Sequence, residues 1–242
     1  MPAMREHMVI DGIGTLFLAI VCLGVPYLAW KSSKRVGSGP LPMSRKRFFI
    51  QTIFAQLYLF ALALAAAWRN GIDLLAAPPS PLFAWTLAAS FLAVLLAVMW
   101  FRWPSRDRES KEKLYRLLPH ERGDLPLYFL VCLAAGICEE TVYRGVATTL
   151  LMRVTGNLSA AILISAIVFA LAHVIQGWRA ALAVFGIALM AHSVVLMTQS
   201  LFPAMAAHAI YDAVAGVVMS RRYQRELESA AQHVLSQTTP MR

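Results

Sequence analysis

Long apolar runs, separated by short polar links, fill the chain from near its start to about residue 219. Most of these runs are long enough, at 1.5 Å per residue, to cross the roughly 30 Å hydrocarbon core of a bilayer. The pattern predicts an all-α fold, a polytopic transmembrane bundle of about seven (six to eight) helices. The expected spans cover residues 8–30, 48–68, 82–101, 125–155, 159–174, 178–199 and 202–219.

The links between these runs differ in charge. Residues 31–47 and 102–124 are rich in Lys and Arg, whereas the link 69–81 has Arg69 as its one basic residue. Because cytoplasmic loops carry an excess of positive charge, this alternation predicts an outside N-terminus and a cytoplasmic C-terminus. We expect a multi-pass protein of the plasma membrane, with a short surface helix over residues 105–118.

The chain reads as one integral membrane domain with three parts. Residues 1–124 hold the N-terminal spans and the surface helix, residues 125–219 hold most of the embedded polar chemistry, and residues 220–242 form a polar tail. Within the first part, Gln51 and Gln56 are expected to face other helices, because amides hydrogen-bond between helices in a membrane.

Composition excludes several classes of protein. Hydrophobic residues make up 59% of the chain and charged residues only 14%, against about 25% charged in soluble domains. The net charge of +9 lies in the loops, which favours lipid headgroups over nucleic acid as the partner. The cysteines, Cys22, Cys132 and Cys138, lie within apolar runs and are expected to pack as small apolar residues.

Two adjacent acids interrupt the fourth apolar run. Glu139 and Glu140 follow a long stretch without charge, and Arg144 comes one helical turn after Glu140. Ionised carboxylates in hydrocarbon are costly and usually functional. Arg144 is placed to pair with Glu140 on one helix face, so Glu139 is the expected reactive acid. The alternative is a helix-end acid near water.

Further titratable residues follow in the later runs. Phe169 and His173 are four residues apart, and so are His208 and Asp212, so each pair shares a helix face. Acids and imidazoles together suit water activation and oxyanion stabilisation. They also suit a divalent metal such as zinc, which Glu139, His173 and His208 could ligate. His192 lacks such neighbours and is expected to hydrogen-bond between helices.

Three short motifs resemble one family. Residues 139–144 match E-E-x-x-x-R, residues 169–173 match F-x-x-x-H, and residues 208–212 match H-x-x-x-N/D. In this order, on separate apolar segments, they resemble the CPBP (Abi) family of intramembrane proteases, related to the type II CAAX prenyl protease. The resemblance covers about residues 125–219. It implies hydrolysis of a peptide bond in a membrane-anchored, prenylated or otherwise hydrophobic substrate.

The resemblance also implies roles for residues. Glu139 and His173 would activate water, and His208 with Asp212 would stabilise the oxyanion, while Glu140 completes the catalytic set. Arg144 and Phe169 would support the site. The family has been described both as metalloproteases and as glutamate-type proteases, so a zinc ion stays open. Prenyl-protein-cleaving members are associated with Asn where this chain has Asp212. An ionised Asp212 would repel an oxyanion, so Asp212 could serve the reaction only if it is protonated, if it orients His208, or if it binds a metal ion.

One requirement of geometry follows. In straight helices Glu139 lies about 21 Å from the start of its span and His173 lies at another depth, so the two meet only if the fourth span is kinked or shortened near residues 136–145. Two alternatives to a protease remain. One is a non-proteolytic membrane scaffold or peptide-immunity or regulatory protein, and the other is a proton-coupled transporter, which predicts inverted repeats that the sequence lacks.

Overall fold

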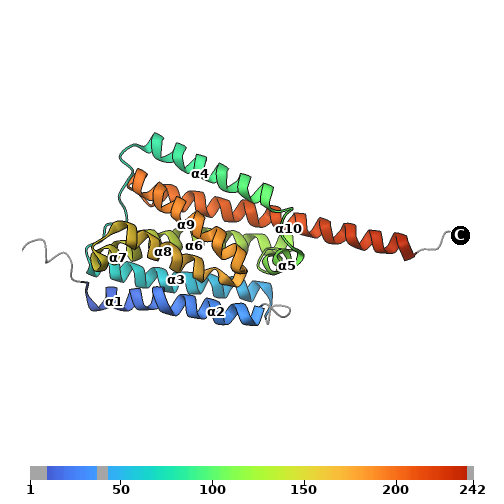
Figure 1. The fold of residues 1–242 in the computed structure, drawn as a ribbon, viewed down its shortest axis with the longest axis horizontal. Helices are drawn as coiled ribbons and strands as arrows, with labels where there is room; N and C mark the ends of the chain where they lie inside the picture. Colours follow the sequence, from blue (N-terminus) through green and yellow to red (C-terminus); the bar gives the residue numbers. More distant parts are fainter. Residues whose placement is uncertain (1–9, 37–42, 239–242) are drawn as a thin grey trace, which may run out of the picture.

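The computed structural model describes residues 10–36 and 43–238, which form a helical bundle with no strand (Figure 1). The α-helices are α1 (Gly12–Ala19), α2 (Val25–Val36), α3 (Arg45–Arg69), α4 (Pro81–Arg102), α5 (Arg108–Arg116), α6 (Leu125–Glu139), α7 (Thr148–Thr155), α8 (Leu158–Ala172), α9 (Trp178–Thr198) and α10 (Phe202–Thr238). The other segments are two π-helices, η2 (Ile20–Gly24) and η4 (Glu140–Ala147), and two 3₁₀ turns, η3 (Arg122–Asp124) and η5 (Val174–Gln176). The prediction of an all-α bundle is confirmed.

Six helical segments within the described residues are long and apolar enough to cross a membrane. They are Gly12–Lys34, Arg45–Arg69, Pro81–Arg102, Arg122–Thr155, Trp178–Thr198 and Phe202–His233. The span expected over residues 159–174 corresponds to α8, which is apolar but has only 15 residues, about 22 Å of helix. The protein is therefore an integral membrane protein, and its described residues include six such segments and the shorter apolar helix α8. Residues 8–9 of the first expected span and residues 37–42 of the first loop lie outside the described part.

The helices that carry the polar residues lie at the centre of the bundle. Helix α6 packs against α3 and α10, while α4 lies at one edge against α9 and α10 (Figure 1). At the opposite edge α1 packs against α3, and α2 packs against α8. Helices α6 and α10 approach closely at Gly136, where an added Cβ would lie 2.7 Å from the Met205 carbonyl oxygen. This contact holds the segment of Glu139 and Glu140 against the helix of His208.

The irregularity that the sequence requires is present. The helix that carries the two acids changes to a π-helix, η4, at Glu140. Segment 122–155 has 34 residues, about 51 Å of helix, so distance from its start does not give depth in the membrane. Depth follows instead from a hairpin at Gly156 (φ 65°), which turns α7 back into α8. Glu139 and His173 lie equally far along the chain from Gly156, on the two sides of the hairpin. The hairpin therefore brings them to a similar depth in the bundle.

The expected surface helix is α5, which lies at the same end of the bundle as the C-terminal part of α10 (Figure 1). Asp107 caps α5 by accepting a hydrogen bond from the Ser110 backbone N–H at 2.8 Å. Lys111 of α5 forms an ion pair at 2.9 Å with Glu226 of α10. The polar tail thus continues α10 as helix to Thr238.

Candidate active site

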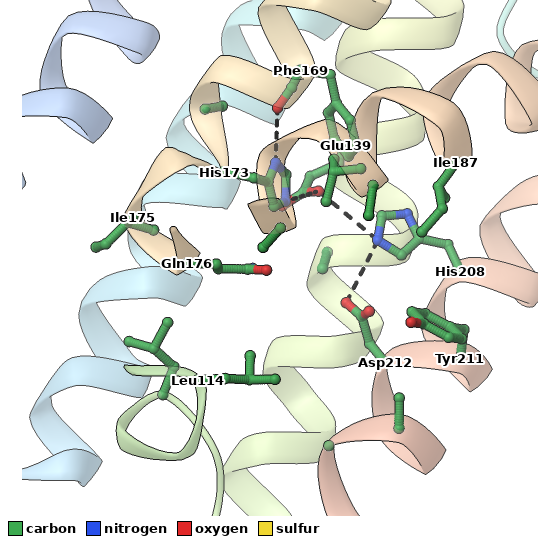
Figure 2. Close-up of a pocket in the computed structure, with 18 of the residues that line it drawn as sticks. Leu114, Glu139, Phe169, His173, Ile175, Gln176, Ile187, His208, Tyr211 and Asp212 are labelled. Carbon is green, nitrogen blue, oxygen red and sulfur yellow. Dashed lines mark hydrogen bonds and ion pairs between the residues drawn. The ribbon is translucent and has the colours of Figure 1, made fainter. Parts of the chain in front are cut away.

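Glu139, at the end of α6, is the point at which the predicted site residues meet. Its Oε1 atom accepts a hydrogen bond from Gln56 Nε2 at 3.1 Å. Its Oε2 atom lies 3.9 Å from His173 Nε2 and 3.9 Å from His208 Nε2, and has no hydrogen-bond partner within the described structure (Figure 2). The side chain is 20% exposed. One oxygen is therefore fixed and the other faces two imidazoles.

His173 ends α8, and its backbone fixes the orientation of its ring. The Nδ1 atom donates a hydrogen bond to the Phe169 carbonyl oxygen, one turn earlier, at 2.8 Å. A carbonyl only accepts, so the proton of the neutral ring lies on Nδ1 and the Nε2 lone pair faces Glu139. The Phe169 ring packs against the imidazole with centroids 4.5 Å apart. Phe169 thus packs beside the site, and its expected supporting role stays a prediction.

His208 lies among three acids. Its Nδ1 atom is 2.8 Å from Glu140 Oε1, and its Nε2 atom is 3.5 Å from Asp212 Oδ2, one turn later on α10. Glu139 faces the same Nε2 atom (Figure 2). Only a protonated ring donates from both nitrogens, and the surrounding carboxylates favour that form by Coulomb attraction.

Glu140 and Arg144 form a buried pair behind His208. Their side chains are each 1% exposed, and Arg144 NH1 lies 3.1 Å from Glu140 Oε1. The guanidinium also stacks over the Phe169 ring at 4.2 Å. The i,i+4 pairing predicted from the sequence is confirmed. Glu140 thus connects a buried cation to His208, whereas the catalytic role expected for it is not tested by this geometry.

A cavity of about 710 Å³ connects this cluster with α5. Its lining includes Glu139, His173, His208 and Asp212, and comes from α2, α3, α4, α5, α6, η4, α8, η5, α9 and α10. Figure 2 shows Leu114 of α5 and Gln176 of η5 on the lining below the cluster. The charged atoms of the cluster therefore face a space that a hydrophobic chain could occupy.

Several expectations about neighbouring residues are also resolved. His192 forms a hydrogen bond with Thr148 at 2.9 Å, which confirms a role between helices. Gln56 is buried and contacts Glu139, but Gln51 is exposed, so the prediction that it faces another helix is wrong. The contact of Gln56 with the site was not predicted. A single amide in an apolar run indicates a polar neighbour but does not identify it.

The described residues contain no group of three or more His, Cys, Asp or Glu side chains arranged to hold a metal ion. The ligands that the sequence suggested for zinc, Glu139, His173 and His208, come together around one oxygen at 3.9 Å, beyond direct hydrogen-bond distance. The zinc ion stays a prediction, and no chemical step below depends on it.

Comparison with protein families agrees with this geometry. Residues 121–214 match the family model described as type II CAAX prenyl endopeptidase Rce1-like. The Rce1-like segment, named for this similarity, comprises 94 of the 242 residues. The match begins just before α6 and ends in α10, so it includes all three motifs, and it confirms the resemblance to CAAX-type proteases. A search of curated proteins and a search of solved structures each found no match. Helices α1 to α5 lie outside the Rce1-like segment.

Proposed function

We propose that the protein is an intramembrane endopeptidase in which Glu139 and His173 activate a water molecule. The observation that carries this proposal is the position of Glu139 Oε2, which faces two imidazole nitrogens at 3.9 Å across the cavity. That separation is too long for a direct hydrogen bond and suits one bridging water. The Rce1-like segment supports a protease-type enzyme.

In the proposed reaction Glu139 acts as general base. The water oxygen bonds to the scissile carbonyl carbon while Glu139 takes a proton and His173 Nε2 accepts the second water hydrogen bond. The carbonyl oxygen becomes the oxyanion of the tetrahedral intermediate. Glu139 then returns its proton to the amide nitrogen, the C–N bond breaks, and a new amine and a new carboxylic acid form; the acid loses its remaining proton to water, and the two products leave.

His208 is the proposed donor to the oxyanion. A protonated His208 presents Nε2–H to the cavity while Nδ1–H is held by Glu140. Asp212 Oδ2 lies 3.5 Å from His208 Nε2, and its negative charge favours the protonated imidazole. Asp212 would thus contribute by keeping His208 protonated, without touching the oxyanion. Arg144 in turn holds Glu140. In this account Glu140 and Arg144 position His208 and do not contact substrate.

The proposed substrate is a membrane-anchored, prenylated or otherwise hydrophobic peptide, because an apolar cavity within a bundle of spans leads to the site. We also propose that the end of the bundle with α5 is cytoplasmic and that the host is the plasma membrane. Basic residues of α5 and of the C-terminal half of α10 gather at that end, including Lys111, Lys113 and Arg225.

The experiment is incubation of the purified protein with matched prenylated and unprenylated hydrophobic peptides, with and without a chelator, followed by mass spectrometry. The proposal expects cleavage at one bond, none with the Glu139→Gln variant, and no loss of cleavage with chelator. Loss of cleavage that only Zn²⁺ restores would establish the zinc alternative. A scaffold predicts no cleavage of any peptide and an unchanged cellular phenotype in Glu139→Gln.

A further inference from the structure

The cavity has opposite charge at its two ends. The acids Glu139, Glu140 and Asp212 lie at the end with the histidines. At the end near α5 the lining includes the cations Arg102, Arg106 and Arg179, with Asp107 as the acid. A ligand with one anionic group would therefore be repelled by the first end and attracted by the second.

Unlike Arg102, which is exposed and also has no ion pair in the described ranges, Arg106 is a cation that lies partly inside this end of the cavity. It is half-buried, between α4 and α5, and its guanidinium makes no hydrogen bond or ion pair with any side chain in the described ranges. The neighbouring acid Asp107 is already occupied, because Arg179 pairs with it at 2.9 Å and Ser110 donates two hydrogen bonds to it.

The surroundings of Arg106 increase its demand for an anion. Burial lowers the pKa of Arg106, and the positive charge of Arg102 acts in the same direction, whereas Tyr211 and Asp107 act in the opposite direction without cancelling the effect of burial. A guanidinium nevertheless stays charged at neutral pH, so the cost of its partial burial is met only by an acceptor. Arginine offers a planar set of donors that matches a carboxylate.

Arg106 and the proposed reaction centre line the same cavity. The charge of Arg106 acts on Tyr211, which lines the cavity and precedes Asp212 on α10. Figure 2 shows Tyr211 beside Asp212 and His208. The rest of the lining is mostly apolar, with residues such as Leu95, Val131 and Ala215. A short hydrophobic peptide segment could therefore connect the centre with Arg106.

We propose that Arg106 binds a carboxylate of the substrate, a few residues from the scissile bond on the α5 side. This inference rests on the proposed function, since it assigns specificity at the same cavity. The carboxylate is either the C-terminus of the peptide or an acidic side chain near it. The acids at the other end of the cavity fix the direction in which the peptide lies.

The test compares three peptides of one apolar sequence: a C-terminal acid, a C-terminal amide, and an amide with a glutamate near the end. For the wild type we expect kcat/KM to favour a carboxylate-bearing peptide over the plain amide by about tenfold or more, mainly through KM. The acid and the glutamate amide together show which source is used. Arg106→Gln removes the preference, and Arg106→Lys retains part of it. The control, Arg108→Gln, changes an exposed arginine of α5 outside the cavity lining and keeps the preference.

Binding to the Glu139→Gln protein gives a reading that does not need cleavage. The proposal expects tighter binding of the carboxylate peptide than of the amide, and loss of that difference when Arg106→Gln is added. Equal binding of all three peptides, or a preference that survives Arg106→Gln, overturns the assignment of Arg106. Cleavage of all three peptides at equal rates would overturn the assignment of Arg106 and leave the proposed protease activity intact. Carboxylate-dependent binding without cleavage by the wild type would reject the protease activity and leave the assignment of Arg106 intact.

Discussion

The two adjacent glutamates occupy regions of opposite character. Glu139 lies on the cavity, 20% exposed, with one oxygen free of hydrogen bonds and two imidazoles opposite it. Glu140 is 1% exposed, enclosed between Arg144 and His208. Successive residues on a helix point about 100° apart, so neighbours in sequence can face different surroundings. The same residue type thus supplies a reactive group on one face and a fixed counter-charge on the next.

This difference predicts that substitutions at the two glutamates and their neighbours affect different quantities, stability in one region and catalytic rate in the other. A buried ion pair is strongly destabilised when one partner is removed, because the other stays buried and uncompensated. Neutralising an acid that lines an accessible cavity costs little free energy of folding, because water can reach the site. Changes on the cavity side should therefore reduce catalysis, and changes on the enclosed side should reduce folding. Four substitutions test this division, from the largest expected effect to the smallest.

His173→Ala should lower kcat by about 10²- to 10⁴-fold, since a positioned general base or water-orienting group contributes that much. Rates on a cleaved peptide and thermal melting of the detergent-solubilised protein measure the two effects. His192→Ala is the control, because His192 is buried but does not line the cavity. It should lower the melting temperature and leave activity per folded molecule near that of the wild type. The reverse pattern would contradict the division.

Arg144→Ala should cost about 3–5 kcal/mol of stability, because it leaves Glu140 buried without its cation. Chemical denaturation in mild detergent measures the loss, and reduced yield should accompany it. The matched control is Arg153→Ala, whose guanidinium is half-buried and donates one hydrogen bond to the Asn70 carbonyl oxygen. Its cost should be about 1 kcal/mol. An equal loss of unfolding free energy in the two variants would mean that the buried Glu140–Arg144 pair stabilises the fold no more than a single hydrogen bond does.

Gly136→Ala should destabilise the contact between α6 and α10 by about 1–3 kcal/mol. The new Cβ would lie 2.7 Å from the Met205 carbonyl oxygen and 2.9 Å from the Ala209 backbone nitrogen, and backbone yields less easily than a side chain. Gly186→Ala in α9 is the control, because its Cβ would meet no atom within 4 Å. That change should be neutral or slightly stabilising, since Ala favours helix over Gly.

Gln56→Leu should lower kcat about two- to tenfold, because it removes the one hydrogen bond that orients Glu139. The fold should persist, since leucine suits a buried helix face. Gln51→Leu, at an exposed position on the same helix, should change neither rate nor melting temperature. An unchanged rate in Gln56→Leu would show that Glu139 is positioned by other contacts.

The sequence was sufficient for the helical bundle and for the set of motifs, because long apolar runs and i,i+4 spacings are local properties. The run at 159–174 is visibly short, but the sequence could not show where it lies in the bundle, since α8 owes its place to the hairpin at Gly156 and to packing against α7 and α9. For Glu139 and His173 to meet, the helix of Glu139 had to be irregular. The sequence located this irregularity only to residues 136–145. The contacts of Gln56 and of Arg106 depend on which helices become neighbours, which no local pattern encodes.

The most direct measurement compares Glu139→Gln and Glu140→Gln in parallel, with peptide cleavage and thermal melting recorded on the same preparations. The account predicts that Glu139→Gln abolishes cleavage at a melting temperature close to that of the wild type. It predicts that Glu140→Gln lowers the melting temperature, because Arg144 loses its counter-charge. Cleavage at the wild-type rate by Glu139→Gln would contradict the assignment of Glu139 as the base that activates water.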